Sequence, residues 1–246
     1  MGGSAIIVAA PSLPEAEEDC VVEAAHPWLP VAIAAARRQA NAEARHLWRM
    51  RAGSTPPFNY RFEHIRSVVA IATRLAEETG ADADIVLAAA WLHDVAKAFA
   101  EERGDGHGLR GAERAKSILR RTDFPSHKIE AVAYAISCHV GLFRDEPIEP
   151  IEAAILFDAD KLSKIGATSL IHVIASYPAS TQRAGGIPDT EGAAAELARW
   201  TELSRRIVDS LSTEAGRQMG EQRLAFLQQM VAQLGLEGAL PPSAEG

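Results

Sequence analysis

Apolar residues along this chain recur every three or four positions, which is the spacing of one face of an α-helix. In the segment 60–79, Ile65, Val68 and Leu75 share one face, and Gly80 follows as a stop signal. β-branched runs are short, so the chain is predicted to be all-α. The periodicity predicts helices over 31–51, 60–79, 85–98, 110–121, 126–140, 151–176, 189–211 and 213–234.

Proline and glycine residues divide these helices into three predicted regions. The pair Pro56-Pro57 is the clearest early boundary, so residues 1–55 are expected to form an N-terminal arm and helix. Residues 56–178 form one helical bundle, and residues 179–246 form C-terminal helices that pack on it. A homodimer surface on those helices is the alternative. Residues 1–25, with two prolines and an acidic cluster, are expected to be a poorly ordered or loosely docked arm.

Three shorter segments have distinct patterns. The segment 85–98 is apolar on almost every side of a helix, which predicts that it is the central buried helix. Residues 104–108 contain three glycines and predict a loop, and residues 177–188 predict a second loop with Pro178 and Pro188.

Composition and charge narrow the classes of function. The chain has 246 residues, 47% of them hydrophobic, which is enough for a sizeable core. Lys and Arg total 25 against 33 Asp and Glu, a formal net charge of −8. Bulk charge therefore recruits no nucleic acid, although a metal ion can supply positive charge for a phosphate locally.

The two cysteines and the apolar stretches indicate a cytoplasmic protein. Cys20 and Cys138 lack the spacing of a metal site and do not make a disulfide framework, so a reducing compartment is the simplest setting. The longest apolar run, 85–92, is far too short to span a membrane. No basic residue precedes the apolar stretch 5–10, so a signal peptide is not expected.

The strongest chemical signal is His93-Asp94, near the end of the most apolar helix. A buried aspartate is costly unless it is paired or binds a metal. Neighbouring residues point about 100° apart on a helix, so both side chains can reach one cation off that edge. Lys97 lies one turn after His93, where it can meet an anionic oxygen of a substrate.

Three other segments place a ligand-type side chain at a position that the pattern predicts to be buried. These are His64, His139 on the stripe of Ile129, Val132 and Ile136, and Asp160 in a nearly all-apolar stretch. Each alone is more often a hydrogen-bonded core residue, as a lone His-Asp pair also is. Together they suggest one shared cation.

These residues in this order resemble the HD superfamily of metal-dependent phosphohydrolases. The resemblance rests on H64, H93-D94 and D160 with their local contexts, and it covers about residues 58–175. It implies an HD-domain helical bundle with extra N- and C-terminal helices, and it implies metal ligands at His64, His93, Asp94 and Asp160. Asp158 points about 200° away from Asp160 on a helix, so it is expected to serve another face.

The number of metal ions stays open. His107 and His139 match extra positions that binuclear members of the superfamily use, so six residues could hold two ions bridged by Asp94. In the glycine-rich loop, His107 could instead be exposed to solvent or contact substrate. The ligands suit Mn, Fe, Co, Ni, Zn or Mg, so the sequence does not select the divalent metal.

The hypothesis is hydrolysis of a phosphate ester or anhydride, because a bound divalent ion activates water and polarises phosphoryl oxygens. Asp94 would orient or deprotonate the water, while Lys97 and Arg61, and alternatively Lys161 or Lys164, would offset phosphate charge. The resemblance implies a nucleotide as the small-molecule substrate. Residues 104–108 lack the Lys-Ser/Thr of a phosphate-binding loop and are interpreted as a mobile loop over the site.

Two alternatives belong to other classes. Some binuclear HD proteins that the six-residue set resembles use two irons and dioxygen to oxidise a small substrate. A non-catalytic bundle that binds a metal or a nucleotide is the other.

Overall fold

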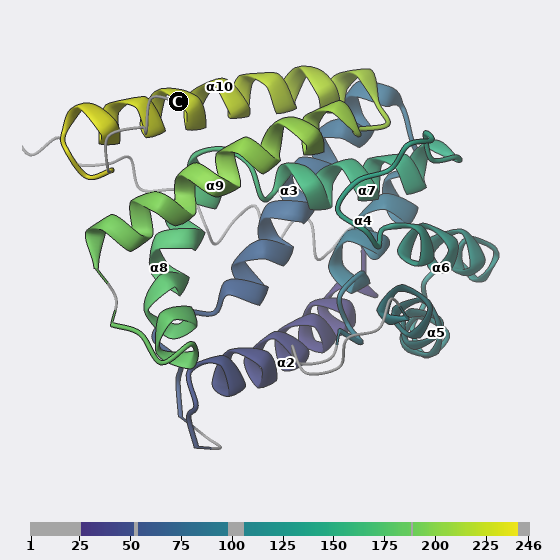
Figure 1. The fold of residues 1–246 in the computed structure, drawn as a ribbon. Helices are drawn as coiled ribbons and strands as arrows, with labels where there is room; N and C mark the ends of the chain where they lie inside the picture. The colour runs from purple at the N-terminus through teal and green to yellow at the C-terminus, as the bar shows by residue number, and fades with distance from the viewer. Residues whose placement is uncertain (1–25, 52–53, 98–105, 188, 241–246) are drawn as a thin grey trace, which may run out of the picture.

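The computed structural model describes residues 26–51, 54–97, 106–187 and 189–240. Over those ranges the chain forms nine α-helices and one short 3₁₀ turn with no strand, which confirms the all-α prediction (Figure 1). The elements are α2 (Leu29–Leu47), α3 (Tyr60–Thr79), α4 (Ala83–Leu92), α5 (His107–Leu119), η1 (Ser126–Lys128), α6 (Ile129–Cys138), α7 (Ile151–Leu162), α8 (Ala167–Arg183), α9 (Thr190–Asp209) and α10 (Glu214–Leu236).

Helices α3, α4 and α7 pack against one another and form the core. Helix α4 is the apolar segment that was predicted to be central, and it buries Val86, Ala88, Ala89, Ala90 and Leu92. Helix α7 is even more enclosed, because every residue from Ala153 to Leu162 is buried. In Figure 1, α2 lies below α3 while α9 and α10 lie above it. Of the described helices, none is long and apolar enough to cross a membrane.

Local capping explains why α3 and α4 begin where they do. The side chain of Asn59 accepts a hydrogen bond from the Phe62 amide, 3.1 Å away, and so caps α3. Gly80 ends that helix with a φ of 72°, a left-handed conformation that glycine adopts at little cost. Asp82 caps α4 by accepting from the amides of residues 84 and 85. The predicted bounds of α3 are confirmed at both ends.

Several predicted helix ends are wrong. The helix predicted over 85–98 ends at Leu92, because the next amides bond back three residues and tighten into turns. The predicted helix 110–121 begins at His107, since the Arg110 amide already bonds the Gly106 carbonyl at 3.1 Å. Ser126 is not a helix N-cap but the first residue of η1.

The region 151–188 departs furthest from prediction. The helix predicted over 151–176 is two helices, because Gly166 has a φ of 98° and breaks the α-helical path between α7 and α8. The loop predicted over 177–188 is helical as far as Arg183, and Pro178 lies inside α8. Helix α8 therefore continues despite the one amide hydrogen bond that proline cannot make.

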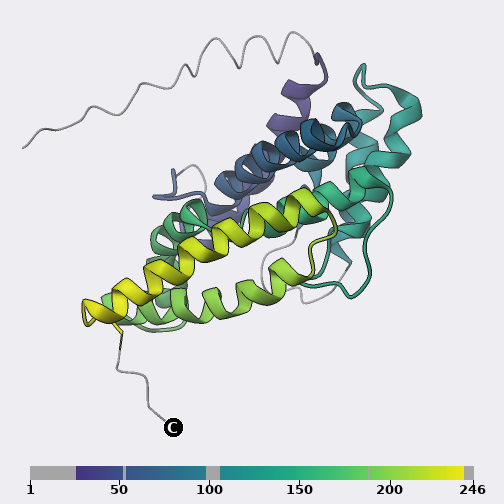
Figure 2. The ribbon, with the colours of Figure 1, turned by 90° about the horizontal axis from the view of Figure 1, so that it is seen from above.

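Helices α9 and α10 form an antiparallel pair along the bundle (Figure 2). They have their own apolar cluster, in which Ile207, Leu224 and Leu227 are fully buried. Asp158 on α7 anchors their turn, accepting from the amides of Ser212 and Thr213 at 2.7 Å each. The predicted arm at 1–25, with Cys20, and most of the predicted glycine loop, including Gly104, lie outside the described residues.

Candidate metal centre

Six side chains predicted as metal ligands come from five elements of the structure. They are His64 on α3, His93 and Asp94 directly after α4, His107 at the start of α5, His139 directly after α6, and Asp160 on α7. All are buried except His107, which is partly exposed. Helix α5 begins three residues earlier than predicted, so His107 lies in a helix and not in a loop.

Hydrogen bonds to backbone carbonyls orient two of the histidine rings. Nδ1 of His93 lies 2.8 Å from the carbonyl oxygen of Ala90, and Nδ1 of His139 lies 2.5 Å from that of Ile136. A carbonyl oxygen only accepts, so Nδ1 donates in both rings. Nε2 of each neutral ring is then left with a bare lone pair, the form in which imidazole binds a metal.

His64 reaches the same state through Ser163. The Ser163 hydroxyl has one proton and donates it to the Asp160 carbonyl at 2.7 Å. The hydroxyl oxygen therefore accepts from Nδ1 of His64, 2.9 Å away. Nε2 of His64 is again the unprotonated nitrogen.

These three Nε2 atoms surround the carboxylate of Asp94. The distances to Asp94 Oδ2 are 3.7 Å from His64 and 3.4 Å from His93, and Nε2 of His139 lies 3.6 Å from Asp94 Oδ1. The Nε2 atoms of His64 and His93 are only 3.3 Å apart. Two lone pairs that face each other at this distance repel, so the arrangement calls for a cation between them.

The described residues contain two groups with metal-ligand geometry, and Asp94 belongs to both. One is His64, His93 and Asp94, and the other is Asp94, His107 and His139; within each group the ligand atoms lie within 4.8 Å of one another. Asp94 Oδ1 and His139 Nε2 are buried, and neither has a hydrogen-bond partner among the described residues. Buried polar atoms without partners are costly, and a metal ion would satisfy both. The residues therefore fit a divalent cation.

Asp160 lies at the edge of this arrangement. Its Oδ1 is 3.2 Å from Nε2 of His64, but it belongs to neither three-residue group. Its carboxylate forms ion pairs with Lys161 and Lys164. Burial alone would raise the pKa of Asp160, but the two lysines hold it well below its usual range. The side chain is therefore a carboxylate that two cations already neutralise.

The electrostatics favour a neutral imidazole set around an ionised aspartate. Burial lowers the pKa of His64 well below its usual range, lowers that of His139, and lowers that of His107 to about 4. Burial alone would raise the pKa of Asp94, but the Arg61 guanidinium beside it holds the pKa well below its usual range. These are the protonation states that metal binding requires.

The four cations predicted to contact phosphate differ in how far their donors are already used. The guanidinium of Arg61 bonds Asp94 through Nη1 and Glu43 through Nε and Nη2. Lys97 has a side chain that is 33% exposed, and within the described ranges its one ion pair is with Asp94 Oδ2 at 3.5 Å.

The other two lysines are turned into the protein. Lys161 donates to the His139 carbonyl at 2.8 Å, pairs with Asp160, and lies 4.5 Å from the ring centre of Phe157. Lys164 pairs with Asp160 and donates to its carbonyl at 2.7 Å. Burial lowers the pKa of Lys164 to about 8. Lys97 is therefore the least engaged of the four predicted cations.

Sequence reasoning missed three residues that contact this site. Glu43 on α2 binds Arg61, Ser163 binds His64, and Tyr60 stacks on the His64 ring with centroids 5.9 Å apart. Ser163 lies three residues after Asp160, so helical spacing could have found it. Nothing in the sequence pairs Glu43 with a residue 18 positions later on another helix.

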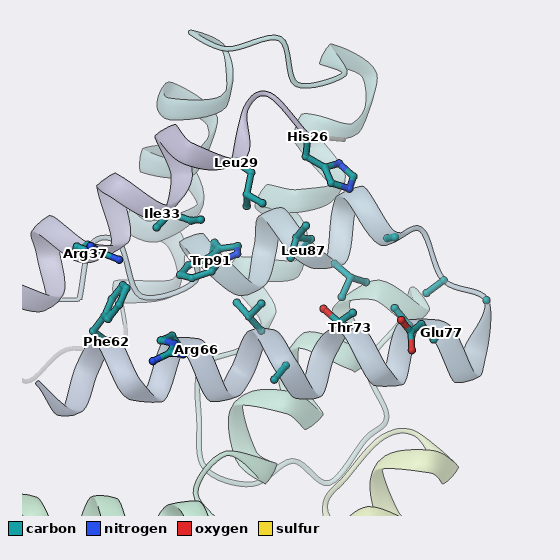
Figure 3. A pocket seen from close by; sticks show the side chains of 17 residues that line it. His26, Leu29, Ile33, Arg37, Phe62, Arg66, Thr73, Glu77, Leu87 and Trp91 are labelled. Atoms are coloured by element: carbon teal, nitrogen blue, oxygen red, sulfur yellow. The ribbon is translucent and has the colours of Figure 1, made fainter. Parts of the chain in front are cut away.

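A cavity of about 930 Å³ lies elsewhere, between α2, α3 and α4 (Figure 3). Leu87 and Trp91 of α4 point into it, and Arg37, Phe62 and Arg66 gather at one end. None of the six predicted ligands lines this cavity. Helix α4 thus carries apolar residues toward the cavity, and His93 and Asp94 follow its last residue at the candidate metal centre.

Comparison with known proteins finds the same domain. Residues 61–165 match the HD domain family. Ribonuclease Y of Aquifex aeolicus is 37% identical over 100 residues, which are 41% of this chain and 16% of that protein. The chain thus spans less than a fifth of the length of the ribonuclease Y that it matches.

Solved structures cover more of the chain. Bacillus subtilis YpgQ in complex with ADP aligns over 81% of this chain and 97% of that one, with 24% sequence identity and a TM-score of 0.54. A predicted HD superfamily hydrolase from an uncultured Thermotogales bacterium aligns over 81% of this chain and 91% of that one, with 24% identity and a TM-score of 0.52. At these identities the structural likeness supports the fold.

Proposed function

Because the chain is an HD domain protein, with the domain at residues 61–165, we propose that it is a metal-dependent phosphohydrolase acting on a nucleotide. The observation that carries the proposal is the convergence of three unprotonated Nε2 atoms on the ionised carboxylate of Asp94. The complex of YpgQ with ADP supports a nucleotide as the small phosphate substrate.

We propose His64, His93 and Asp94 as the residues that hold one divalent ion, with Asp160 beside them. His107 and His139, together with Asp94, would hold a second. A divalent ion there would lower the pKa of a bound water and polarise a phosphoryl oxygen. Asp94 is a weak proton acceptor, because its pKa is held well below its usual range. Its contribution is to orient water through a carboxylate oxygen.

Lys97 is the proposed contact for the substrate phosphate. Its side chain is one-third exposed and its ammonium has N–H donors beyond the one that faces Asp94. Arg61, in contrast, already uses all three guanidinium nitrogens. A lysine ammonium serves phosphate as a point charge. Arg61 is accordingly assigned to holding Asp94, and Lys97 to offsetting the charge of the phosphate.

Metal analysis of the purified protein, followed by a panel of substrates, tests the proposal. The panel holds nucleotides, generic phosphoesters and a short RNA, each with Mn²⁺, Mg²⁺, Co²⁺ and Zn²⁺. Asp94→Ala should lose metal and activity together. Lys97→Ala should keep its metal and lose about 100-fold in kcat/KM, because a transition-state contact is removed. An Asp94→Ala protein that retains both metal and activity refutes the assignment.

A second candidate function follows from the two ligand groups that share Asp94. Two irons held by these two groups would suit an oxygenase acting on a small substrate. Two irons per chain with oxygen uptake, and no phosphoester turnover with Mn²⁺ or Mg²⁺, would favour it. Metal binding without either reaction would indicate a non-catalytic module.

A further inference from the structure

Glu43 on α2 lies outside the matched HD domain and yet binds a residue of the candidate metal centre. Its carboxylate accepts a fork of two hydrogen bonds from Arg61, with Nε 2.8 Å from Oε2 and Nη2 2.9 Å from Oε1. Arg61 directs its remaining nitrogen, Nη1, to Oδ2 of Asp94. Glu43 on α2, Arg61 and Asp94 therefore form a line of three alternating charges, and Asp94 is the residue that both candidate ligand groups share.

The fork restricts where Arg61 can point. An arginine side chain is long and flexible, but a bidentate bond to a carboxylate fixes the plane of its guanidinium. Arg61 is also buried, with a side chain only 8% exposed, so its orientation depends on these two partners. With Oδ2 of Asp94 held by Nη1, the other carboxylate oxygen faces His139 Nε2 at 3.6 Å.

Charge gives Glu43 a second effect. Arg61 paired with Asp94 alone would be neutral, and a neutral pair attracts a cation weakly. Glu43 adds a negative charge, so the line of Glu43, Arg61 and Asp94 has a net charge of −1. Glu43 thus offsets part of the positive charge that Arg61, and Lys97 at 3.5 Å from Asp94 Oδ2, bring to the centre, and the burial of Asp94 limits the screening of this effect.

We propose that Glu43 is a positioning residue of the metal centre, which acts through Arg61 to orient Asp94 and to preserve its charge for a divalent cation. The inference rests on the proposed function only in taking the centre at Asp94 as the place where the cation binds. The charge line itself comes from contacts between the described side chains.

Other contacts hold α2 in place, so Glu43 can be changed without detaching the helix. Ala32, Ala36 and Ala40 of α2 are completely buried. Asn41 accepts a hydrogen bond from Asn59 at 2.8 Å, which links α2 to the start of α3. Asn41→Ala therefore breaks a link between the same two elements without touching Arg61, and it is the matched control.

The test measures the affinity of the full chain for Mn²⁺ alone. Glu43→Gln keeps the volume of the side chain and removes its charge, and it should weaken Mn²⁺ binding about 10- to 100-fold, as the loss of a residue that orients a ligand typically does. Glu43→Asp keeps the charge and should retain more affinity than Glu43→Gln. Asn41→Ala should bind Mn²⁺ like the unmodified protein.

A double-mutant cycle separates action through Arg61 from a general loss of structure. In an Arg61→Gln background, Glu43→Gln should have no further effect on Mn²⁺ affinity. Equal Mn²⁺ affinity of Glu43→Gln and the unmodified protein overturns the inference while leaving the proposed function intact. Equal losses in Glu43→Gln and Asn41→Ala overturn it too. Weaker Mn²⁺ binding in Glu43→Gln, together with no phosphoester turnover by the unmodified protein, supports Glu43 and contradicts the proposed function.

Discussion

At the scale of single residues, the tautomers of the three buried histidines decide what the centre can bind. Two of them are set by carbonyl oxygens of their own helices, which no side-chain substitution removes. The third depends on one hydroxyl, that of Ser163. Of these three histidines, His64 is therefore the one whose orientation is most open to mutation.

We expect Ser163→Ala to weaken Mn²⁺ binding by about 10-fold, because Nδ1 of His64 loses its acceptor and the ring loses its fixed tautomer. Isothermal titration of Mn²⁺ into the protein measures this. Ser180→Ala is the control, since Ser180 is exposed and its hydroxyl donates to the Ser176 carbonyl of the same helix. Unchanged affinity in Ser163→Ala would show that the hydroxyl does not orient His64.

The ligand-type residues could be predicted from the sequence because each interrupts an apolar pattern. A histidine or aspartate at a position that periodicity assigns to the core needs a partner, and this was the argument for His64, His139 and Asp160. Glu43 offered no such signal, because it lies on the polar side of its own helix, partly exposed. Its partner is visible only once α2 and α3 are placed side by side.

At the scale of elements, close packing of α5 sets the position of His107 and His93. A Cβ added at Gly111 would lie 3.0 Å from the His93 carbonyl oxygen and 3.2 Å from the side chain of Ile136. Glycine at this position lets α5 approach the end of α4 and the face of α6.

We expect Gly111→Ala to destabilise the fold by about 1–3 kcal/mol, because the added methyl group forces the His93 carbonyl and the Ile136 side chain to move. The same shift should weaken Mn²⁺ binding by displacing His93. Urea unfolding gives the free energy. Gly235→Ala in α10 is the matched control, because no atom of the described part of the chain lies within 4 Å of its added Cβ. It should be neutral or stabilising by up to about 1 kcal/mol, and a Gly111→Ala protein equally stable would contradict the packing argument.

The joint between α7 and the C-terminal helices depends on Asp158. Its carboxylate accepts from two amides and from the Thr213 hydroxyl, all at 2.7 Å. We expect Asp158→Ala to cost about 2–4 kcal/mol in urea unfolding, because those buried donors lose their acceptor. Glu202→Ala, at an exposed position of α9, should change stability by less than about 0.5 kcal/mol. A small loss in Asp158→Ala would show that water replaces the carboxylate.

Most elements follow from periodicity and caps, and the errors have local causes. The bounds of α3 could be predicted because Gly80 and the apolar stripe agree. The break between α7 and α8 could not, since the residues on both sides of Gly166 continue a helical pattern. The pattern predicts that Pro178 lies in a loop, but α8 accommodates it. Side-chain pattern alone does not report the backbone angle at one glycine.

At the scale of the whole molecule, helices outside the HD domain match contact the bundle at two places, one of them beside the candidate centre. Helix α2 contributes Glu43, and α9 and α10 are joined to α7 through Asp158. The division at residues 55 and 178 remains a prediction. The contacts of Glu43 and Asp158 suggest that the flanking helices and the bundle unfold together.

Bound metal should stabilise the folded chain. A ligand that binds only the folded chain stabilises it, by about 2.7 kcal/mol at 100 times its Kd. Removing metal with a chelator at neutral pH should therefore lower the Tm, and adding Mn²⁺ should restore it. A Tm that changes neither with the chelator nor with added Mn²⁺ would indicate that no metal binds the folded chain.

Acid should destabilise the metal-free protein even before its carboxylates titrate. Burial keeps the pKa of His64, His107 and His139 below the ordinary value of 6.5, and that of His107 at about 4. As the pH falls below about 6.5, these side chains take up protons in the unfolded chain but not in the folded one, so the equilibrium shifts toward unfolding. The pKa of Asp94 is held low, so its contribution is lost only under more acidic conditions.

We therefore expect the Tm of the chelated protein to fall from about pH 6.5 to about pH 5, and His107→Gln to reduce that slope. A Tm that stays constant or rises over this interval would mean that these three histidines are already protonated in the folded state, which is incompatible with free Nε2 lone pairs on His64 and His139.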